Sequence, residues 1–326
     1  MRLDPADLML LVLVVAFAWS MGAHYTGACM GMPFASGSIR LWPALILMAA
    51  LTLVGATLAS HHVEATVGED IVQARDVTVA AAMVIIFTAF LLTTAYTYLR
   101  IPTSTIQILV FSVVGTALAT GVRVHWATIG HLAILWVLAP PVACGLAYCC
   151  THLVDLLSPK AREGEGRGSV LPTLLVIVGA AASFTMGAND VSNSTGALVM
   201  THLFGLLAAG FAGGVGLAIG VLTWGQPLLK KVAFDIVRVD LAMASAAQFV
   251  QAAVVFTAVT FGLFTSMNQA LVGAMAGTGL ARGRQTVRWP QVAGILKGWA
   301  IGPASGLALG FLLTHLVALA LPNALG

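Results

Sequence analysis

Charged residues are scarce in this sequence. Asp, Glu, Lys and Arg together make up 8% of its 326 residues, whereas a soluble domain carries about 25%. Hydrophobic residues make up 59%. The net charge of +3 is spread over short loops without a basic run, so nothing points to a nucleic-acid partner. This composition predicts an integral membrane protein whose surroundings are the lipid bilayer.

Motifs for catalysis and for metal binding are also missing. There is no HExxH pattern, and the histidines are scattered. The cysteines lie in apolar segments without a CxxC pair, which is typical of small buried hydrophobic residues; they are Cys29, Cys144, Cys149 and Cys150. We therefore predict no catalytic residue and no cofactor, and we predict that the protein is not an enzyme.

Apolar stretches account for most of the chain. A helix needs about 20 residues to cross the roughly 30 Å of bilayer hydrocarbon. The stretches are 8–19, 42–60, 77–98, 105–120, 126–154, 170–183, 204–224, 241–264, 270–280 and 292–319. Several are too short to cross alone or contain Gly and Pro, which favours broken or re-entrant helices. We predict an all-α, multi-pass protein of the cell membrane (the inner membrane in a bacterium) with about 10–12 transmembrane or re-entrant segments.

Several short motifs occur twice, in the same order, in the two halves of the chain. The matching segments are 20–25 with 185–190, 68–72 with 233–237, 103–107 with 265–269, and 115–121 with 277–283. A polar, glycine-rich linker at 158–168 separates the halves. Duplicated halves with interrupted helices are typical of secondary transporters that bind substrate near the bilayer midplane. We predict a first membrane repeat at 1–157 and an inverted second repeat at 169–326, with broken helices at the midplane.

One acidic residue, Asp190, stands alone in the second half. Between positions 168 and 229 it is the only Asp, Glu, Lys or Arg. A carboxylate inside a membrane is costly and is by default a functional candidate. Its neighbours offer further oxygen atoms, which suit a hard cation; they are Asn189, Ser192, Asn193, Ser194 and Thr195. A helix starting beyond a break here would also offer N–H groups to an anion. For the Ser and Thr residues, hydrogen bonding between helices is the alternative.

Polar clusters recur at 103–107 and 265–269, each between two apolar runs. Their hydroxyls and amides would hydrogen-bond a desolvated oxyanion from two sides. Pro102 favours a local break, because proline removes a backbone donor. A polar loop at the membrane surface is the alternative. His24 has three interpretations: a proton carrier, a substrate ligand, or a hydrogen-bonded interior histidine.

The stretch GANDVSNSTGALV at 187–199 resembles the inorganic phosphate transporter family, whose hallmark is a Gly-Ala-Asn-Asp-Val-Ala-Asn-Ala type motif in both repeats. Ile101-Pro-Thr-Ser-Thr105 is similar to the Pro-x-Ser-Thr hairpin of that family, and Gly279-Leu-Ala-Arg-Gly-Arg284 follows the second hairpin. The resemblance covers nearly the whole chain. It implies an inverted-repeat, cation-coupled oxyanion symporter, a homodimer, with substrate and cation held where the two motifs and two hairpins converge.

The sequence departs from that family where the first motif should carry Asn-Asp, because His24 and Tyr25 stand there. The second hairpin has Asn268 and Gln269 where the phosphate carriers tend to have Thr-His. In both respects the chain looks more like the bacterial sulfate permease branch. Sulfate carries no proton at neutral pH, so a carboxylate would repel it, whereas monohydrogen phosphate can donate an O–H to one. A site that has lost one carboxylate therefore favours sulfate.

These considerations give a predicted site and function. Substrate binding is predicted for His24, Tyr25, Thr26, Thr103, Ser104, Thr105, Asn193, Ser194, Thr195, Thr265, Ser266 and Asn268. Binding of a coupling cation is predicted for Asn189, Asp190, Ser192, Gln107, Gln269 and His24, with Asp190 as the Na+ ligand if sodium is the cation. The predicted function is uptake of sulfate by symport with Na+ or H+. A phosphate symporter and, more remotely, an anion channel are the alternatives.

Overall fold

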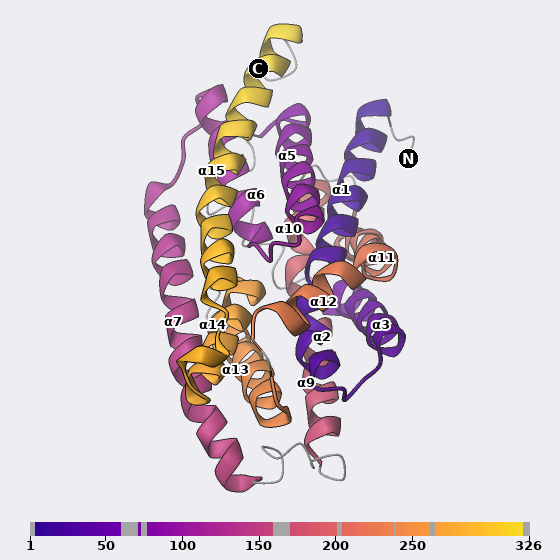
Figure 1. Cartoon of the computed structure of the whole chain (residues 1–326). Coiled ribbons are helices and arrows are strands. Elements are labelled where there is room, and N and C mark those ends of the chain that lie inside the picture. Colours follow the sequence, from indigo (N-terminus) through magenta and orange to yellow (C-terminus); the bar gives the residue numbers. More distant parts are fainter. Residues whose placement is uncertain are drawn as a thin grey trace.

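The chain is almost entirely helical in a computed structural model that describes residues 4–59, 71–72, 77–158, 170–200, 204–237, 239–260 and 265–321. The helices of the first half are α1 (Pro5–His24), α2 (Thr26–Ala35), α3 (Leu41–Ala59), α5 (Val79–Tyr98), α6 (Thr105–Thr120) and α7 (Trp126–Leu157). Those of the second half are α9 (Leu171–Asp190), α10 (Ser192–Met200), α11 (Leu206–Trp224), α12 (Gln226–Asp235), α13 (Leu241–Thr260), α14 (Met267–Ala281), the 3-10 turn η4 (Arg284–Thr286) and α15 (Trp289–Ala320). The all-α prediction is confirmed (Figure 1).

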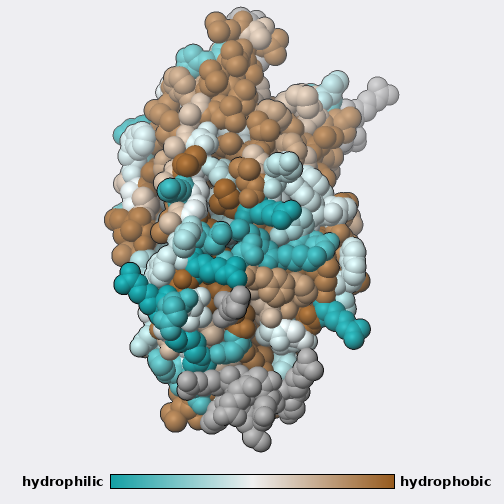
Figure 2. Space-filling view, viewed as in Figure 1, coloured by the Kyte–Doolittle hydropathy of each residue, from teal (hydrophilic) through white to brown (hydrophobic). Residues whose placement is uncertain are grey.

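The protein is a multi-pass membrane protein. Among the described residues, eight helical stretches are long and apolar enough to cross a bilayer. Helices α6 and α14, with 16 and 15 residues, are shorter than a full crossing. Large apolar side chains cover the outer faces of the long helices, such as Val137 on α7, which is 71% exposed. In Figure 2 apolar residues cover the upper part of the molecule, and hydrophilic residues gather in a band across the middle and lower part of this face.

Two membrane helices are interrupted, as predicted, each about two-thirds of the way along its length. Between α1 and α2 lies Tyr25, and between α9 and α10 lies Val191. The Thr26 hydroxyl donates to the Ala23 carbonyl at 3.0 Å, so a side chain partners the backbone beside the first interruption. The predicted linker at 158–168 falls outside the described residues apart from Ser158.

Helices α6 and α14 begin in the same way. Ser104 is extended, and its hydroxyl accepts a hydrogen bond from the backbone N–H of Gln107 at 3.4 Å. Ser266 is likewise extended and accepts from the N–H of Gln269 at 3.4 Å. A serine cap satisfies one of the backbone donors that a helix start leaves free. The other N–H groups of both first turns remain available to a ligand.

The two halves of the chain interlock through reciprocal helix contacts. Helix α1 packs against α11, and α9 packs against α3; in the same manner α6 packs along α15, and α14 along α7. Glycines allow the close approach. A Cβ atom on Gly22 would lie 2.0 Å from the backbone oxygen of Leu217, and one on Gly187 would lie 2.1 Å from that of Thr52. Each half therefore uses the other as its packing surface.

The close contact at Gly22 predicts that adding a single methyl group there destabilises the protein. In Gly22→Ala the new Cβ would overlap the α11 backbone, which cannot move as a flexible side chain can. We expect destabilisation of about 1–3 kcal/mol or more, seen as a lower melting temperature and less monodisperse protein in detergent. Gly145→Ala on α7 is the control, since nothing lies within 4 Å of its Cβ position. Equal behaviour of the two variants would contradict the packing argument.

An ion cluster joins three helix ends at one end of the molecule. Arg282, after α14, binds Asp155 of α7 through both terminal nitrogens and donates from Nε to Asp240 at 2.9 Å. The hydrogen bond to Asp155 contributes most to raising the pKa of Arg282 above its ordinary value. Asp240 also accepts from the backbone N–H of Met243 at 2.8 Å and thereby caps α13. The cluster fixes the ends of α7, α13 and α14 relative to one another.

Candidate functional site

The predicted site residues lie in the buried interior where the interrupted helices and the two hairpins meet. Of the described residues, those classed as buried include one carboxylate, Asp190, and no Lys or Arg. Asp190 is 3% exposed. A binding site built here relies on neutral hydrogen-bonding groups, helix termini and a single acidic side chain.

The two oxygens of the Asp190 carboxylate differ in their hydrogen bonding. Its Oδ1 accepts from Nδ2 of Asn193 at 3.4 Å, whereas Oδ2 is buried and has no hydrogen-bond partner. The hydroxyl of Tyr25 lies close enough to the carboxylate for a side-chain hydrogen bond to contribute, although it falls outside strict hydrogen-bond geometry, and the thiol of Cys29 lies within electrostatic range. An ionised oxygen buried without a partner costs several kcal/mol. Asp190 therefore has the chemistry expected of a ligand for a cation or a proton.

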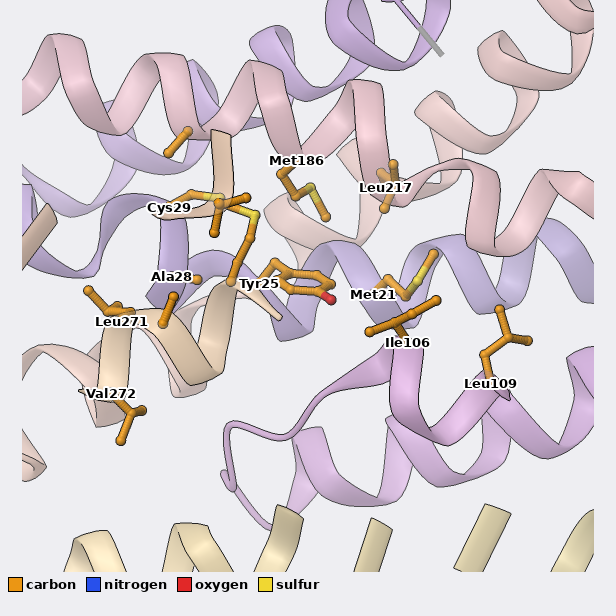
Figure 3. Packing of buried hydrophobic residues seen from close by; sticks show 14 of the residues in the cluster. Met21, Tyr25, Ala28, Cys29, Ile106, Leu109, Met186, Leu217, Leu271 and Val272 are labelled. Atoms are coloured by element: carbon orange, nitrogen blue, oxygen red, sulfur yellow. The ribbon is translucent and has the colours of Figure 1, made fainter. Parts of the chain in front are cut away.

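Tyr25 carries a polar group from the first interruption into the same region. Its hydroxyl shares a hydrogen bond of 2.7 Å with the Thr105 hydroxyl at the start of α6. Figure 3 shows the ring inside the packed core, with its hydroxyl directed away from Ala28 and toward the side where Ile106 lies. Tyr25 thus stands between Asp190 and the first hairpin, at the position where the family motif would have a second carboxylate.

Hydrogen bonds hold His24 in place. Its Nδ1 lies 2.8 Å from the Thr97 hydroxyl, which is also 2.8 Å from the Thr93 carbonyl. Its Nε2 lies 3.1 Å from the backbone N–H of Thr103 and 3.2 Å from the Thr103 carbonyl. Both ring nitrogens are therefore engaged by the protein, and the contact with Thr103 serves either tautomer. Of the three interpretations of His24, the geometry favours the hydrogen-bonded interior histidine, which holds the first hairpin in place.

The two hairpins, whose tips are the segments 103–107 and 265–269, touch each other. Asn268 donates from Nδ2 to the Thr103 carbonyl at 2.8 Å. In the first turns of α6 and α14, the side-chain amides of Gln107 and Gln269 exchange two hydrogen bonds, at 3.4 and 3.3 Å. The first turns of α6 and α14 thus meet from different halves of the chain. Their partial positive charges would repel one another unless an anion lay between them. The buried hydroxyl of Thr265 beside them has no hydrogen-bond partner.

Several predicted ligands point elsewhere. The hydroxyl of Thr26 shares its one proton between the Ala23 carbonyl and the closer Gly225 carbonyl, at 2.7 Å, which ties α2 to the start of α12. Ser192, Ser194 and Thr195 donate to carbonyls of their own chain segment, at Asn189 or Val191. Thr195 and Ser194 lie toward Gly213 of α11. For these residues the alternative of bonding within and between helices describes what is seen.

Other interior polar residues were not predicted. Thr97 is the partner of His24, and two fully buried glutamines, Gln248 and Gln251, lie on α13. A signal for the glutamines was present: two amides three residues apart in an apolar helix share one face, and such groups inside a membrane are seldom without a role.

The arrangement agrees with comparisons to known proteins. The family model described as the phosphate transporter family matches residues 21–310. The chain belongs to this family. It is therefore a membrane transporter and not an enzyme, as predicted. Its relatives include sulfate permease CysP of Bacillus subtilis, 27% identical over 95% of this chain and 88% of that protein. A probable low-affinity inorganic phosphate transporter of Mycobacterium leprae is 26% identical over 95% of this chain and 80% of that protein.

Among solved structures, the fold is similar to one described as the sodium-dependent phosphate transporter. The TM-score is 0.86, with 20% sequence identity, over 98% of this chain and 100% of that one. At that identity the similarity establishes a shared fold.

Proposed function

We propose that this chain is a secondary carrier of a tetrahedral inorganic oxyanion, with sulfate as substrate and a cation as co-substrate. The convergence of two capped helix starts, α6 and α14, carries the proposal. Backbone N–H groups at helix N-termini are anion ligands, and here two such ends meet in the buried interior. The substrate ligands would be the first-turn N–H groups together with Thr103, Thr105, Thr265 and Asn268.

Sulfate is favoured over phosphate by the identity of residue 25. Tyr25 has an O–H to offer where a second aspartate would present a repelling charge. Sulfate accepts hydrogen bonds and donates none at neutral pH, so donors suit it. A relative named as a sulfate permease supports this choice. Relatives named as phosphate transporters make phosphate the alternative substrate.

Charge balance supports coupling to a cation. Sulfate brings two negative charges to a buried region that holds Asp190 and, among the described buried residues, no Lys or Arg. Uncompensated charge in that environment is strongly unfavourable. Cations that bind with the anion would neutralise it, with Asp190 as their acidic ligand. The described sodium dependence of the structural neighbour favours Na+ over H+.

The repeated elements fit a carrier better than a channel. The α1–α2 and α9–α10 interruptions, the two capped hairpins and the reciprocal packing of α6 and α14 are pairs of like elements. We infer two inverted membrane repeats, at 1–157 and 169–326, that exchange their packing to expose the site to each side in turn. The homodimer remains a prediction.

The test is uptake of radiolabelled sulfate into proteoliposomes, with sodium and proton gradients imposed separately. We expect accumulation above equilibrium, driven by a sodium gradient, with unlabelled phosphate failing to compete. Equilibration without accumulation would indicate a channel. Accumulation of phosphate in place of sulfate would refute the role given to Tyr25.

A further inference from the structure

An apolar cavity opens on the outer face of the molecule, where α7, α14 and α15 come together. Its volume is about 620 Å³, which falls within the range of about 300–1,000 Å³ that is typical of ligand sites. Figure 1 shows α7 and α15 running side by side at the left of the view. Exposed side chains from both helices line the mouth of the cavity, including Val137 and Leu296. The cavity is therefore accessible from the lipid that surrounds the helices.

The cavity extends along the helices from one end of the bundle to the hairpins. On α15 its lining runs from Trp289 to Ala300, and on α14 it runs from Gln269 to Leu280. Both stretches correspond to about 16 Å of helix, which is about half of the roughly 30 Å of bilayer hydrocarbon. At the inner end lie Gln269 and its partner Gln107, whose amides join the two hairpins. The depth of the cavity thus matches one leaflet of the membrane.

A cation lies at the outer end of the cavity. The guanidinium of Arg284 stands over the ring of Trp289, 5.8 Å from its centroid, and the Arg284 carbonyl accepts from Nε1 of Trp289 at 3.2 Å. The arginines on either side, Arg282 and Arg288, both pair with aspartates. Arg284 is exposed and pairs with no carboxylate among the described residues. Tryptophan and arginine together at the end of a membrane helix are typical of the headgroup region.

We propose that this cavity holds one acyl chain of an anionic phospholipid, whose phosphate pairs with Arg284. The apolar lining and its length fit the chain, and a guanidinium binds phosphate through paired hydrogen bonds. An anionic headgroup is favoured over a zwitterionic one, because the latter would bring its own cation close to Arg284. The inner end of the chain would lie against Gln107 and Gln269, so the lipid would support the contact between the two hairpins.

The test measures lipid binding in the absence of any transported anion. Full-length protein in detergent receives equal amounts of phosphatidylglycerol and phosphatidylcholine with the same acyl chains, and native mass spectrometry measures which lipid is retained. We expect a preference of about tenfold or more for phosphatidylglycerol, the equivalent of one hydrogen bond between charged groups. Arg284→Gln should abolish the preference. Arg123→Gln is the matched control, since it removes the same charge from an exposed arginine between α6 and α7.

A second variant tests the cavity itself. Ala300→Phe would place a large side chain in the cavity, and we expect it to reduce retention of both lipids about tenfold, with a melting temperature in detergent close to that of the native protein. Ala293→Phe is the control, because Ala293 lies exposed on the same helix and away from the cavity lining. If Ala300→Phe does not fold, Arg284→Gln decides the question.

Equal retention of the two lipids by the native protein would overturn the proposal, as would variants of Arg284 and Ala300 that behave like their controls. Conversion of dimer to monomer in Ala300→Phe, without loss of lipid, would also overturn it and would assign the cavity to an interface between two copies of the chain. Because no substrate is present, neither result would bear on the proposed function.

Discussion

Asp190→Asn is expected to abolish accumulation of sulfate. The substitution keeps the size of the side chain and its contact with Asn193, but it removes the only acidic charge among the described buried residues. Loss of one charge–charge interaction in a buried site corresponds to a fall of about 100-fold or more in initial uptake. The measurement is the initial rate of labelled sulfate uptake into proteoliposomes under a sodium gradient, normalised to the reconstituted protein.

Asp235→Asn is the matched control for this variant. Its carboxylate lies on α12, is 45% exposed and pairs with Lys231 at 3.2 Å, so the same chemical change there should leave uptake close to native. Exposed ion pairs contribute about 0–1 kcal/mol. Concentrative uptake by Asp190→Asn at the native rate would show that the coupling cation binds elsewhere.

Tyr25→Phe is expected to raise the half-saturating sulfate concentration about tenfold or more, the equivalent of one hydrogen bond to a charged group. The phenyl ring keeps the core packing of a side chain that is 0% exposed. The variant loses the hydroxyl that pairs with Thr105 and that we assign to the anion. Saturation curves for sulfate under a sodium gradient test this, with phosphate competition measured alongside.

Tyr148→Phe is the control for Tyr25→Phe, because it makes the same substitution on the outer surface of the protein. Tyr148→Phe removes a hydroxyl from α7, where the side chain is 44% exposed, and sulfate saturation should be unaffected. If Tyr25→Phe lowered the melting temperature and the maximal rate while leaving the half-saturating concentration unchanged, Tyr25 would have a packing role only.

Helix boundaries were predictable from the sequence where capping residues mark both ends of the helix. The run 105–120 coincides with α6 because Ser104 caps its start and Gly121, at a φ of 75°, ends it. Helix α12 was not predicted, since Lys230, Lys231 and Asp235 interrupt the apolar pattern. The interruption near Asp190 was expected from its glycines, yet it falls at Val191. Gly187 lies inside α9 and serves the close contact with Thr52 of α3. Packing between helices distant in the sequence decided that position.

The site was predictable in its residue types and less so in its contacts. The meeting of Thr103 with Asn268 follows from pairing the two hairpins. The hydrogen bonding of His24 depends on Thr97, more than seventy positions away in the sequence, which no local pattern links to it. The hydrogen bonding of Gln248 depends on a backbone carbonyl of α2, 220 positions away. Tertiary contacts of this kind determine which polar groups are satisfied and which remain for ligands.

The interlocking of the halves also governs how the protein is made. A membrane protein enters the bilayer from its N-terminus as it is synthesised, so α1 and α3 arrive long before α11 and α9, against which their glycines pack. Until then, these faces meet lipid or other proteins of the insertion machinery. The final structure can close only after the second half has been translated. Ribosome stalling or truncation beyond α7 would thus leave an inserted but unclosed half, a natural substrate for membrane quality control.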